Sequence, residues 1–177
     1  ALVSAHLIVA LQSIVSRNVD PLAACVVSIC TINTDSRADN VIPQTVTLGG
    51  TVRTLDDSVR DFAEARVHDI SAGIAATFGA TAVVDYHRGY PVTINAPDQT
   101  EYAAAAAITV AGQVDLTVDP MMGAEDFSYM LNTRPGAYMF IGNGDSAGLH
   151  HPAYDFDDSV IPAGCSWFVQ MIEERMP

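Results

Sequence analysis

Two adjacent histidines, His150 and His151, lie between a glycine and a proline. Several carboxylates follow them within residues 149–158. Neutral imidazole is the commonest protein ligand for transition metals, and nearby carboxylates orient the ring and raise its basicity. The pattern therefore predicts a metal site at the pair. The alternative is a structural loop in which the imidazoles form hydrogen bonds to Asp155 or Asp157.

Two upstream motifs accompany the histidine pair. Residues 120–128 contain a Gly-Ala-Glu-Asp-Phe run, and further back Asn40 precedes Val-Ile-Pro while Arg53 follows Gly-Gly-Thr-Val. In this order, and with matching segments from residue 11 to residue 164, the motifs resemble the M20 family of metal-dependent amidohydrolases and peptidases. The resemblance is strongest to the branch of hippurate hydrolases, aminoacylases and auxin-conjugate hydrolases. The motifs are specific as a set, whereas one alone is not.

The resemblance implies a hydrolase of the M20 type, a metal-dependent amidohydrolase or carboxypeptidase. Such an enzyme cleaves the amide bond of an N-acyl amino acid (hippurate-like), or of a related amide or peptide, with a metal-activated water. It implies two divalent metals per active site, chosen among Zn, Mn, Ni and Co. It also implies a homodimer or tetramer formed through a lid domain. The alternative function is a non-catalytic dimerisation or binding module of plait fold.

The resemblance carries over to individual positions. The family's C-terminal metal ligand falls on His150, while His151, where relatives commonly have Ser or Asn, is the less favoured ligand. Arg53 and Asn40 match residues that hold the substrate's carboxylate, for which a guanidinium fork and an amide N–H are suited. Asn95 matches a recurrent family asparagine near the hinge and is counted as substrate-binding. Asn40 has the alternative of capping a turn.

The acidic pair of the Gly-Ala-Glu-Asp-Phe run has two interpretations. Glu125 matches a position close to the metal cleft, so a cleft-lining role is considered, while acids at a helix start also serve as caps. No residue of the chain is predicted to be catalytic, because the resemblance puts the water-activating glutamate and most metal ligands before residue 1. The 177 residues alone are therefore expected to be inactive.

Composition excludes several classes of partner. With 8 basic against 21 acidic residues, the net charge is −13, which argues against nucleic acid and anionic membranes because phosphate binding needs Lys and Arg. No apolar run approaches the ~20 residues of a membrane span. Cys25, Cys30 and Cys165 form no CxxC pair, and buried, reduced thiols in a cytoplasmic protein are expected.

The first half of the chain predicts a lid. Hydrophobic spacing and turn residues indicate a helix, two strands, a helix capped by Thr54, and a third strand. The expected ranges are 1–18, 22–34, 41–54, 54–78 and 80–90. One more strand before residue 1 would complete β-α-β-β-α-β, the ferredoxin-like plait. The chain is thus expected to be a piece of something longer.

The second half predicts part of an α/β catalytic domain. Its expected elements alternate between helix and strand: helix 98–111, strand 114–118, helix 124–131, strand 138–142 and helix 161–176. The predicted fold class is α/β with an α+β lid. Residues 1–95 form the ferredoxin-like lid or dimerisation domain, and residues 96–177 form the C-terminal segment of a zinc-peptidase-like catalytic domain.

Overall fold

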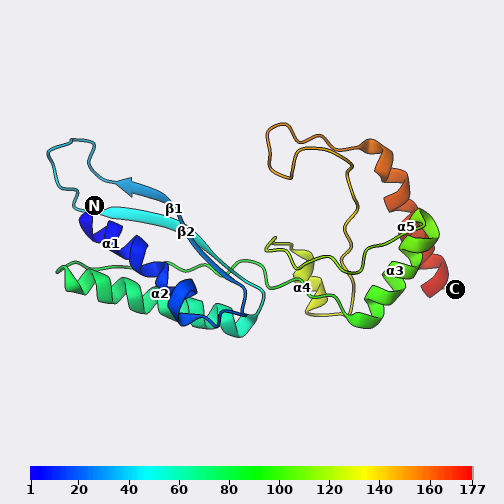
Figure 1. Ribbon diagram of the computed structural model, residues 1–177, viewed down its shortest axis with the longest axis horizontal. Coiled ribbons are helices and arrows are strands. Elements are labelled where there is room, and N and C mark those ends of the chain that lie inside the picture. Colours follow the sequence, from blue (N-terminus) through cyan, green and yellow to red (C-terminus); the bar gives the residue numbers. More distant parts are fainter. Residues whose placement is uncertain (177) are drawn as a thin grey trace. The chain divides into compact units, whose positions relative to one another are not determined.

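The computed structural model describes residues 1–176, which form two compact units (Figure 1). The first unit contains Ala1–Val92 together with the short segment Pro120–Ala124. The second contains Thr93–Asp119 and the chain from Glu125 onward. Helices and a small sheet together make a mixed α/β chain, as the sequence predicts.

The first unit is built on an antiparallel pair of strands. Strand β1 (Cys25–Thr34) pairs with β2 (Val46–Thr54), from Cys25 opposite Thr54 to Thr34 opposite Val46. The register shifts between Ile29 and Thr31. At the shift, a Cβ on Gly50 would collide with the Ser28 carbonyl oxygen, so only glycine allows this close approach of the two backbones.

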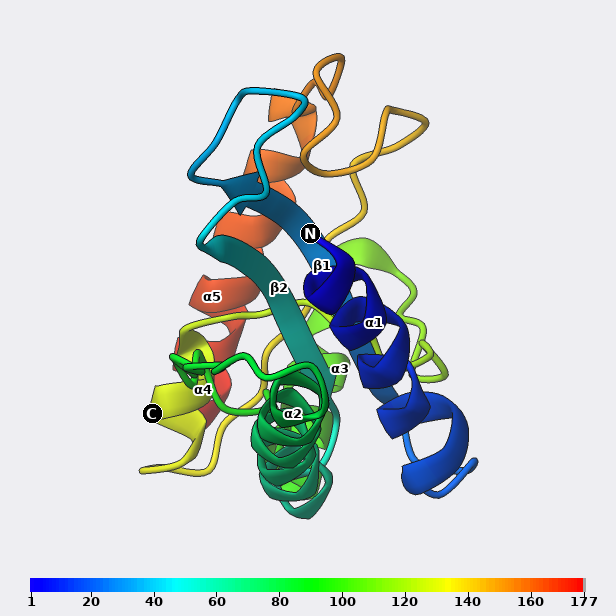
Figure 2. The same ribbon diagram turned by 90° about the vertical axis from the view of Figure 1, so that its left-hand side faces the viewer.

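Two helical segments cover one face of this sheet (Figures 1 and 2). Helix α1 (Leu2–Leu11) continues through Gln12 and Ser13 into a π-helical turn, η1 (Ile14–Asn18), and helix α2 spans Asp57–Thr77. Alternate residues of β1 face the helices because strand side chains alternate between faces. The buried core consists of Leu11, Ile14, Cys25, Val27 and Ala63.

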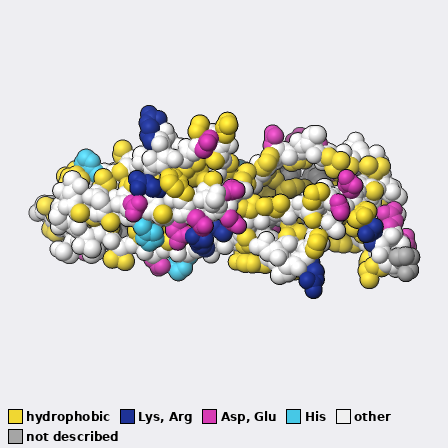
Figure 3. Space-filling view, turned by 90° about the horizontal axis from the view of Figure 1, so that it is seen from below, with side chains coloured by type: hydrophobic (Ala, Val, Ile, Leu, Met, Phe, Trp, Pro, Cys, Tyr) yellow, Lys and Arg dark blue, Asp and Glu magenta, His cyan; other side chains and the backbone are white. Residues whose placement is uncertain are grey.

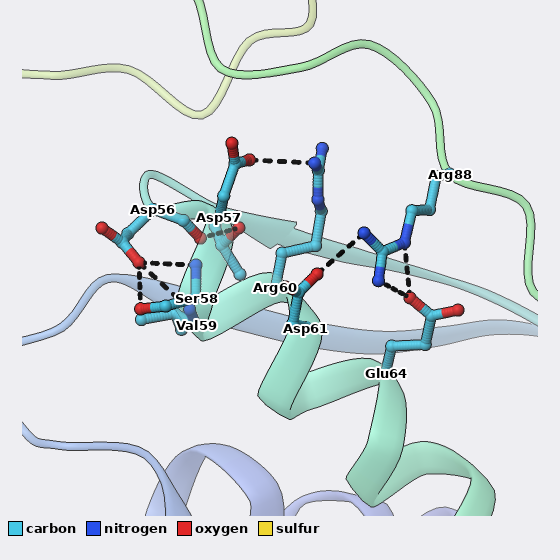
Figure 4. Close-up of polar contacts among 9 residues, drawn as sticks. Asp56, Asp57, Ser58, Val59, Arg60, Asp61, Glu64 and Arg88 are labelled. Carbon is cyan, nitrogen blue, oxygen red and sulfur yellow. Dashed lines mark hydrogen bonds and ion pairs between the residues drawn. The ribbon is translucent and has the colours of Figure 1, made fainter.

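Helix α2 begins later than the sequence predicts. Its N-cap is Asp56, whose carboxylate accepts hydrogen bonds from the backbone N–H groups of Ser58 (2.8 Å) and Val59 (3.1 Å) (Figure 4). The expected cap, Thr54, instead donates its hydroxyl to the Asp56 carbonyl oxygen. The prediction of Thr54 was wrong because both residue types cap helices, and only the turn geometry decides between them.

Residues 80–90 do not form the predicted third strand. A strand needs a hydrogen-bonded neighbouring strand, and the sheet that the described residues form contains only β1 and β2. Arg88 instead fastens it to α2 through Asp61 (2.7 Å) and Glu64 (2.6 Å from Nε to Oε2) (Figure 4). Both acids lie one turn apart on the same face of the helix.

The second unit packs helix α3 (Pro97–Ala111) against helix α5 (Ile161–Arg175). Pro97 occupies the first turn of α3, and Gly112 ends it in the left-handed conformation (φ 77°), as expected for these residue types. Small side chains on α3 let the helices approach, since Ala103, Ala104 and Ala106 are buried. The Trp167 indole N–H of α5 donates to the Ala103 carbonyl oxygen at 2.9 Å.

The rest of the second unit is less regular than predicted. Helix α4 spans Phe127–Leu131, three residues shorter at its start than expected, and a 3₁₀ turn, η2 (Asp158–Val160), leads into α5. The predicted strands at 114–118 and 138–142 were wrong: neither range is a strand. Apolar runs of this length carry no information about a pairing partner, and the described residues supply none.

Two predictions about side chains and membranes have clear outcomes. Cys25 is buried, but Cys30 and Cys165 are exposed free thiols, so the prediction of buried thiols was wrong for two of them. No helix within residues 1–176 is long and apolar enough to cross a membrane. Figure 3 shows many hydrophobic side chains exposed on the face that it draws, with acidic and basic groups between them.

Candidate functional site

His150 is the only non-glycine residue among the described ones with a positive φ, at 67°. Left-handed backbone is uncommon for a residue with a Cβ, and such strain concentrates at functional positions. The side chain is exposed, and neither ring nitrogen has a hydrogen-bond partner within residues 1–176. A neutral imidazole in this state has a lone pair available for a metal.

His151 has a different environment. Its Nδ1 accepts a hydrogen bond from the backbone N–H of Ala153 at 3.0 Å. A neutral imidazole carries one proton, so an accepting Nδ1 assigns that proton to Nε2. In this arrangement one ring nitrogen of His151 accepts a hydrogen bond and the other carries the proton.

The carboxylates that follow the pair do not bind it. No hydrogen bond joins either histidine to Asp155 or Asp157 in the part of the chain that the structure describes, so the alternative of a histidine–aspartate loop pair was wrong. The Asp157 carboxylate caps η2 instead, and hydrogen bonds from the Ser159 side chain and backbone hold its pKa below the ordinary value.

Asn143 organises this acidic segment. Its side-chain N–H donates to the Asp155 carbonyl oxygen (2.7 Å), and its Oδ1 accepts from the Asp157 N–H (2.7 Å). An open hollow of about 530 Å³ lies between residues 143–147 and 153–158. Sequence reasoning missed Asn143, because the residues that it joins are 12 and 14 positions away.

Glu125 lies in a network of hydrogen bonds at the start of α4. Its Oε1 accepts from the Phe127 N–H (3.3 Å) and its Oε2 from the Tyr138 hydroxyl (3.0 Å). The pKa of Glu125 is lowered, first by a hydrogen bond with Asp126 and then by these two donors. The pKa of Asp126 is raised by the same bond and by repulsion from Glu125.

Tyr138 connects this network to Asn95. The Asn95 amide N–H donates to the Tyr138 carbonyl oxygen (2.9 Å), and Asn95 Oδ1 accepts from the Tyr138 N–H (2.7 Å). Both polar atoms of Asn95 are thus engaged by one backbone residue, 43 positions away. Sequence reasoning missed Tyr138; its apolar neighbours to Gly142 were the only signal, and they were interpreted as a strand.

Arg53 and Asn40 lie in the first unit. Arg53, on β2, is exposed and donates one Nη1–H to the Met122 carbonyl oxygen at 2.6 Å. A guanidinium has five N–H groups, so most of its donors are left for a ligand. Asn40 is exposed in the turn between β1 and β2, and its side chain has no hydrogen bond to any described residue.

The described residues do not make a complete metal centre. Residues 1–176 contain no group of three or more His, Cys, Asp or Glu side chains placed to hold an ion. Protein zinc sites use at least three protein ligands. His150 has the chemistry of one such ligand, because its imidazole is exposed and has no hydrogen-bond partner among residues 1–176.

Comparison with known families decides which proteins this chain resembles. Residues 5–174 match the family model of Peptidase family M20/M25/M40. The chain belongs to this family. The match covers nearly every described element, from α1 to α5, and so includes both units.

Individual M20 proteins agree with this assignment. The chain is 39% identical to an N-acetyl-L-cysteine deacetylase of Bacillus subtilis over 98% of its own length and 41% of that protein's. It is 34% identical to a hippurate hydrolase of Campylobacter jejuni, over 93% of this chain and 43% of the hydrolase. The chain therefore spans less than half the length of these relatives.

A solved structure shares the fold. A dinuclear metal-binding peptidase of the M20 family from Bacillus subtilis matches with a TM-score of 0.78 and 25% sequence identity. The match covers 96% of this chain and 44% of that one. The fold of this chain is thus that of the corresponding part of an M20 peptidase.

Proposed function

We propose that the complete protein containing this chain is a metal-dependent amidohydrolase that cleaves the amide bond of N-acyl amino acids or of a related amide or peptide. The observation that carries the proposal is the family match over residues 5–174. The names of two relatives support the bond type, because a deacetylase of N-acetyl-L-cysteine and a hippurate hydrolase both act on N-acyl amino acids.

The two parts of the chain have different proposed roles. Residues 1–95 act as a ferredoxin-like lid through which the protein forms a homodimer or tetramer, and residues 96–177 complete the catalytic domain. The packing of α1 and α2 on one face of the β1–β2 pair supports the lid assignment. The extended segment 80–90, which Arg88 ties to α2, also supports the lid assignment. In a plait, the last strand follows the second helix along the chain.

His150 is the proposed metal ligand, as one contribution to a centre of two divalent ions (Zn, Mn, Ni or Co). Its exposed ring without hydrogen bonds and the description of the solved relative as dinuclear support this role. When bound, such ions polarise the amide carbonyl and lower the pKa of a coordinated water. This chain's part is to orient the imidazole and the substrate.

Arg53 and Asn40 are proposed to hold the carboxylate of the substrate's amino acid. Arg53 has N–H groups beyond the one donated to Met122 and can form a fork to a carboxylate. Asn40 has an exposed amide to add a neutral donor. Asn95, which the sequence predicts to bind substrate, is proposed to have an indirect role. Its amide atoms hold the backbone of Tyr138. Asn95 thereby supports Glu125, which lines the cleft.

The test is hydrolysis by the full-length protein of a panel of N-acyl amino acids with Mn²⁺ or Zn²⁺. We expect turnover that a chelator abolishes and added metal restores. Arg53→Lys should raise KM more than it lowers kcat, because lysine keeps the charge but loses the fork. Its matched control is Arg37→Lys, an exposed arginine in the preceding turn. Absence of chelator-sensitive hydrolysis, with less than one tight ion per chain, would favour the non-catalytic dimerisation module.

A further inference from the structure

His150 occupies the position of a tight turn that demands a positive φ. The backbone N–H of His151 donates to the Gly148 carbonyl oxygen at 3.1 Å, so residues 148–151 form a β-turn with His150 third. A turn with φ of 67° at its third residue ordinarily has glycine or asparagine there. A histidine in this place is strained and must be held by its surroundings.

A second turn begins where the first one ends. The N–H of Tyr154 donates to the His151 carbonyl oxygen at 2.9 Å, and Pro152 is the second residue of this turn, where its fixed φ is favourable. His151 is therefore the last residue of one turn and the first residue of the next. Both of its backbone polar groups serve the loop.

The side chain of His151 adds a third bond to the same loop. Its Nδ1 accepts from the N–H of Ala153, two residues on, at 3.0 Å. This is the geometry in which an aspartate or asparagine side chain closes an Asx-turn. The bond holds the start of the second turn in place directly after the strained His150.

We propose that His151 is a positioning residue for His150 and is not a second metal ligand. It acts by closing the loop that keeps His150 in its left-handed conformation, with its ring exposed and unbonded. The hydrogen bond from Ala153 occupies Nδ1 and leaves the proton on Nε2. This inference rests on the proposed function in that it takes His150 to be the ligand.

The hydrogen bond at Nδ1 makes a specific prediction about replacements. Asparagine can accept the Ala153 N–H with its Oδ1 and so keeps the turn, but it is a poor ligand for Zn²⁺ compared with imidazole. Alanine loses both properties. His151→Asn and His151→Ala therefore separate a positioning role from coordination.

The experiment measures metal affinity of the full-length protein by competition with a chromogenic chelator, using Zn²⁺ as the probe. The variants are His150→Ala, His151→Ala and His151→Asn, with His87→Ala as the control that removes an exposed imidazole elsewhere. Amide exchange at Ala153 in the metal-free protein gives a second readout that does not depend on activity.

We expect His150→Ala to lose one tight ion and His87→Ala to bind like the parent. His151→Ala should weaken binding about 10-fold or more, the usual effect of removing a partner of a metal ligand. His151→Asn should restore affinity to within a few-fold of the parent. The Ala153 amide should exchange faster in His151→Ala and remain protected in His151→Asn.

Each of the other outcomes would overturn the inference about His151. Loss of the ion in both His151 variants, to the extent seen for His150→Ala, makes His151 a ligand and overturns the inference. Parental affinity in His151→Ala overturns it as well, while His150 keeps its proposed role. Full metal binding by His150→Ala removes His150 from the proposed centre, and the inference about His151 fails with it.

Discussion

His150 combines a strained backbone with the proposed role of metal ligand. A positive φ at a non-glycine residue costs free energy, and here it coincides with a ring that no described residue bonds. Evolution tolerates such a cost where the side chain is needed. The neighbouring residue, His151, has both its backbone groups and its Nδ1 engaged in the loop, so the two histidines have separate tasks.

Two substitutions at His150 isolate the backbone strain. His150→Gly and His150→Ala both remove the imidazole, but only glycine adopts a φ of 67° without a Cβ clash. We expect the glycine variant to be more stable than the alanine variant by about 1 kcal/mol. The difference is smaller than the free energy cost of the left-handed backbone, because glycine also gains entropy in the unfolded chain. Urea denaturation of both variants measures the difference. Equal stability would mean that the loop relaxes to a negative φ.

Tyr138→Phe tests the network around Glu125. The lowered pKa of Glu125 comes first from Asp126 and then from the Phe127 N–H and the Tyr138 hydroxyl. Removal of the hydroxyl takes away one donor to the charged form, so the pKa of Glu125 should rise toward its ordinary value. Carboxyl ¹³C NMR titration follows this pKa. The control is Tyr102→Phe, which alters a ring that packs under Arg175 and should leave the pKa of Glu125 unchanged. The same change of this pKa in both variants would contradict the hydrogen bond from Tyr138 to Glu125.

At the scale of elements, caps and ion pairs position the helices, and a small core holds them to the sheet. Asp56 fixes where α2 begins, and Arg88 ties the following extended segment to it (Figure 4). In the core, Ile14 lies in the π-helical turn that ends the first helical segment and is fully buried. These contacts are specific enough to be tested one by one.

The capping carboxylate of α2 should make stability depend on pH. Hydrogen bonds from the Ser58 hydroxyl, and then from the backbone N–H groups of Val59 and Ser58, lower the pKa of Asp56. A group with a lowered pKa in the folded state stabilises the protein above its unfolded pKa, and this contribution is lost as pH falls through the folded value.

Asp56→Ala should therefore lower Tm by a few degrees at pH 7, because the cap is lost. The difference in Tm between Asp56→Ala and the parent should become smaller below pH 3.8, which is the ordinary pKa of an aspartate. Asp56→Asn keeps a cap and should lie between the two at pH 7. Thermal unfolding between pH 2 and pH 8, followed by circular dichroism, measures all three proteins. A gap that is the same at every pH would argue against a charged cap.

Ile14 and Ile32 form a matched pair for the core. Ile14 has no exposed surface, whereas 58% of Ile32 is exposed on β1. Ile14→Ala should cost about 2–5 kcal/mol, since it removes buried methylene groups and leaves a cavity. Ile32→Ala should stay within about 0.5 kcal/mol. Guanidinium denaturation compares the two, and similar losses at both sites would contradict the assigned core.

At the scale of the whole chain, many large hydrophobic side chains are exposed. Leu22, Ile42 and Val83 are each more than 90% exposed, and Phe168 of α5 is 64% exposed. Exposed apolar side chains that adjoin one another mark contact with another polypeptide or with another part of the same one. The chain spans less than half the length of the relatives that it matches.

A purified chain of residues 1–177 should be inactive and should bind a hydrophobic dye such as ANS. The physical reasons are the exposed apolar side chains and the lack of three clustered metal ligands in residues 1–176. The full-length protein should bind less dye per mole and hydrolyse N-acyl amino acids. Chelator-sensitive turnover by the 177-residue chain would contradict the proposal that its metal ligands come from elsewhere.

The sequence by itself determined the family, the main helices and several side-chain candidates. Helix α2 follows from hydrophobic spacing between Asp57 and Thr77, and α3 from a proline at its start and a glycine at its end. The family motifs identified Arg53 and His150 as candidates, because their residue types suit carboxylate and metal binding. These are local properties, which short stretches of sequence encode.

Only the tertiary structure decided what depends on partners distant in sequence. Asn95 holds Tyr138 across 43 residues, and Arg88 reaches back 24 residues to Glu64. Three apolar runs predicted as strands are not strands among residues 1–176, because hydrophobic alternation specifies a face but supplies no neighbouring strand. The environments of the two histidines likewise depend on tertiary structure: a hydrogen bond occupies Nδ1 of His151, and the backbone of His150 has a positive φ. Both depend on how the loop closes in three dimensions, which residue types alone do not specify.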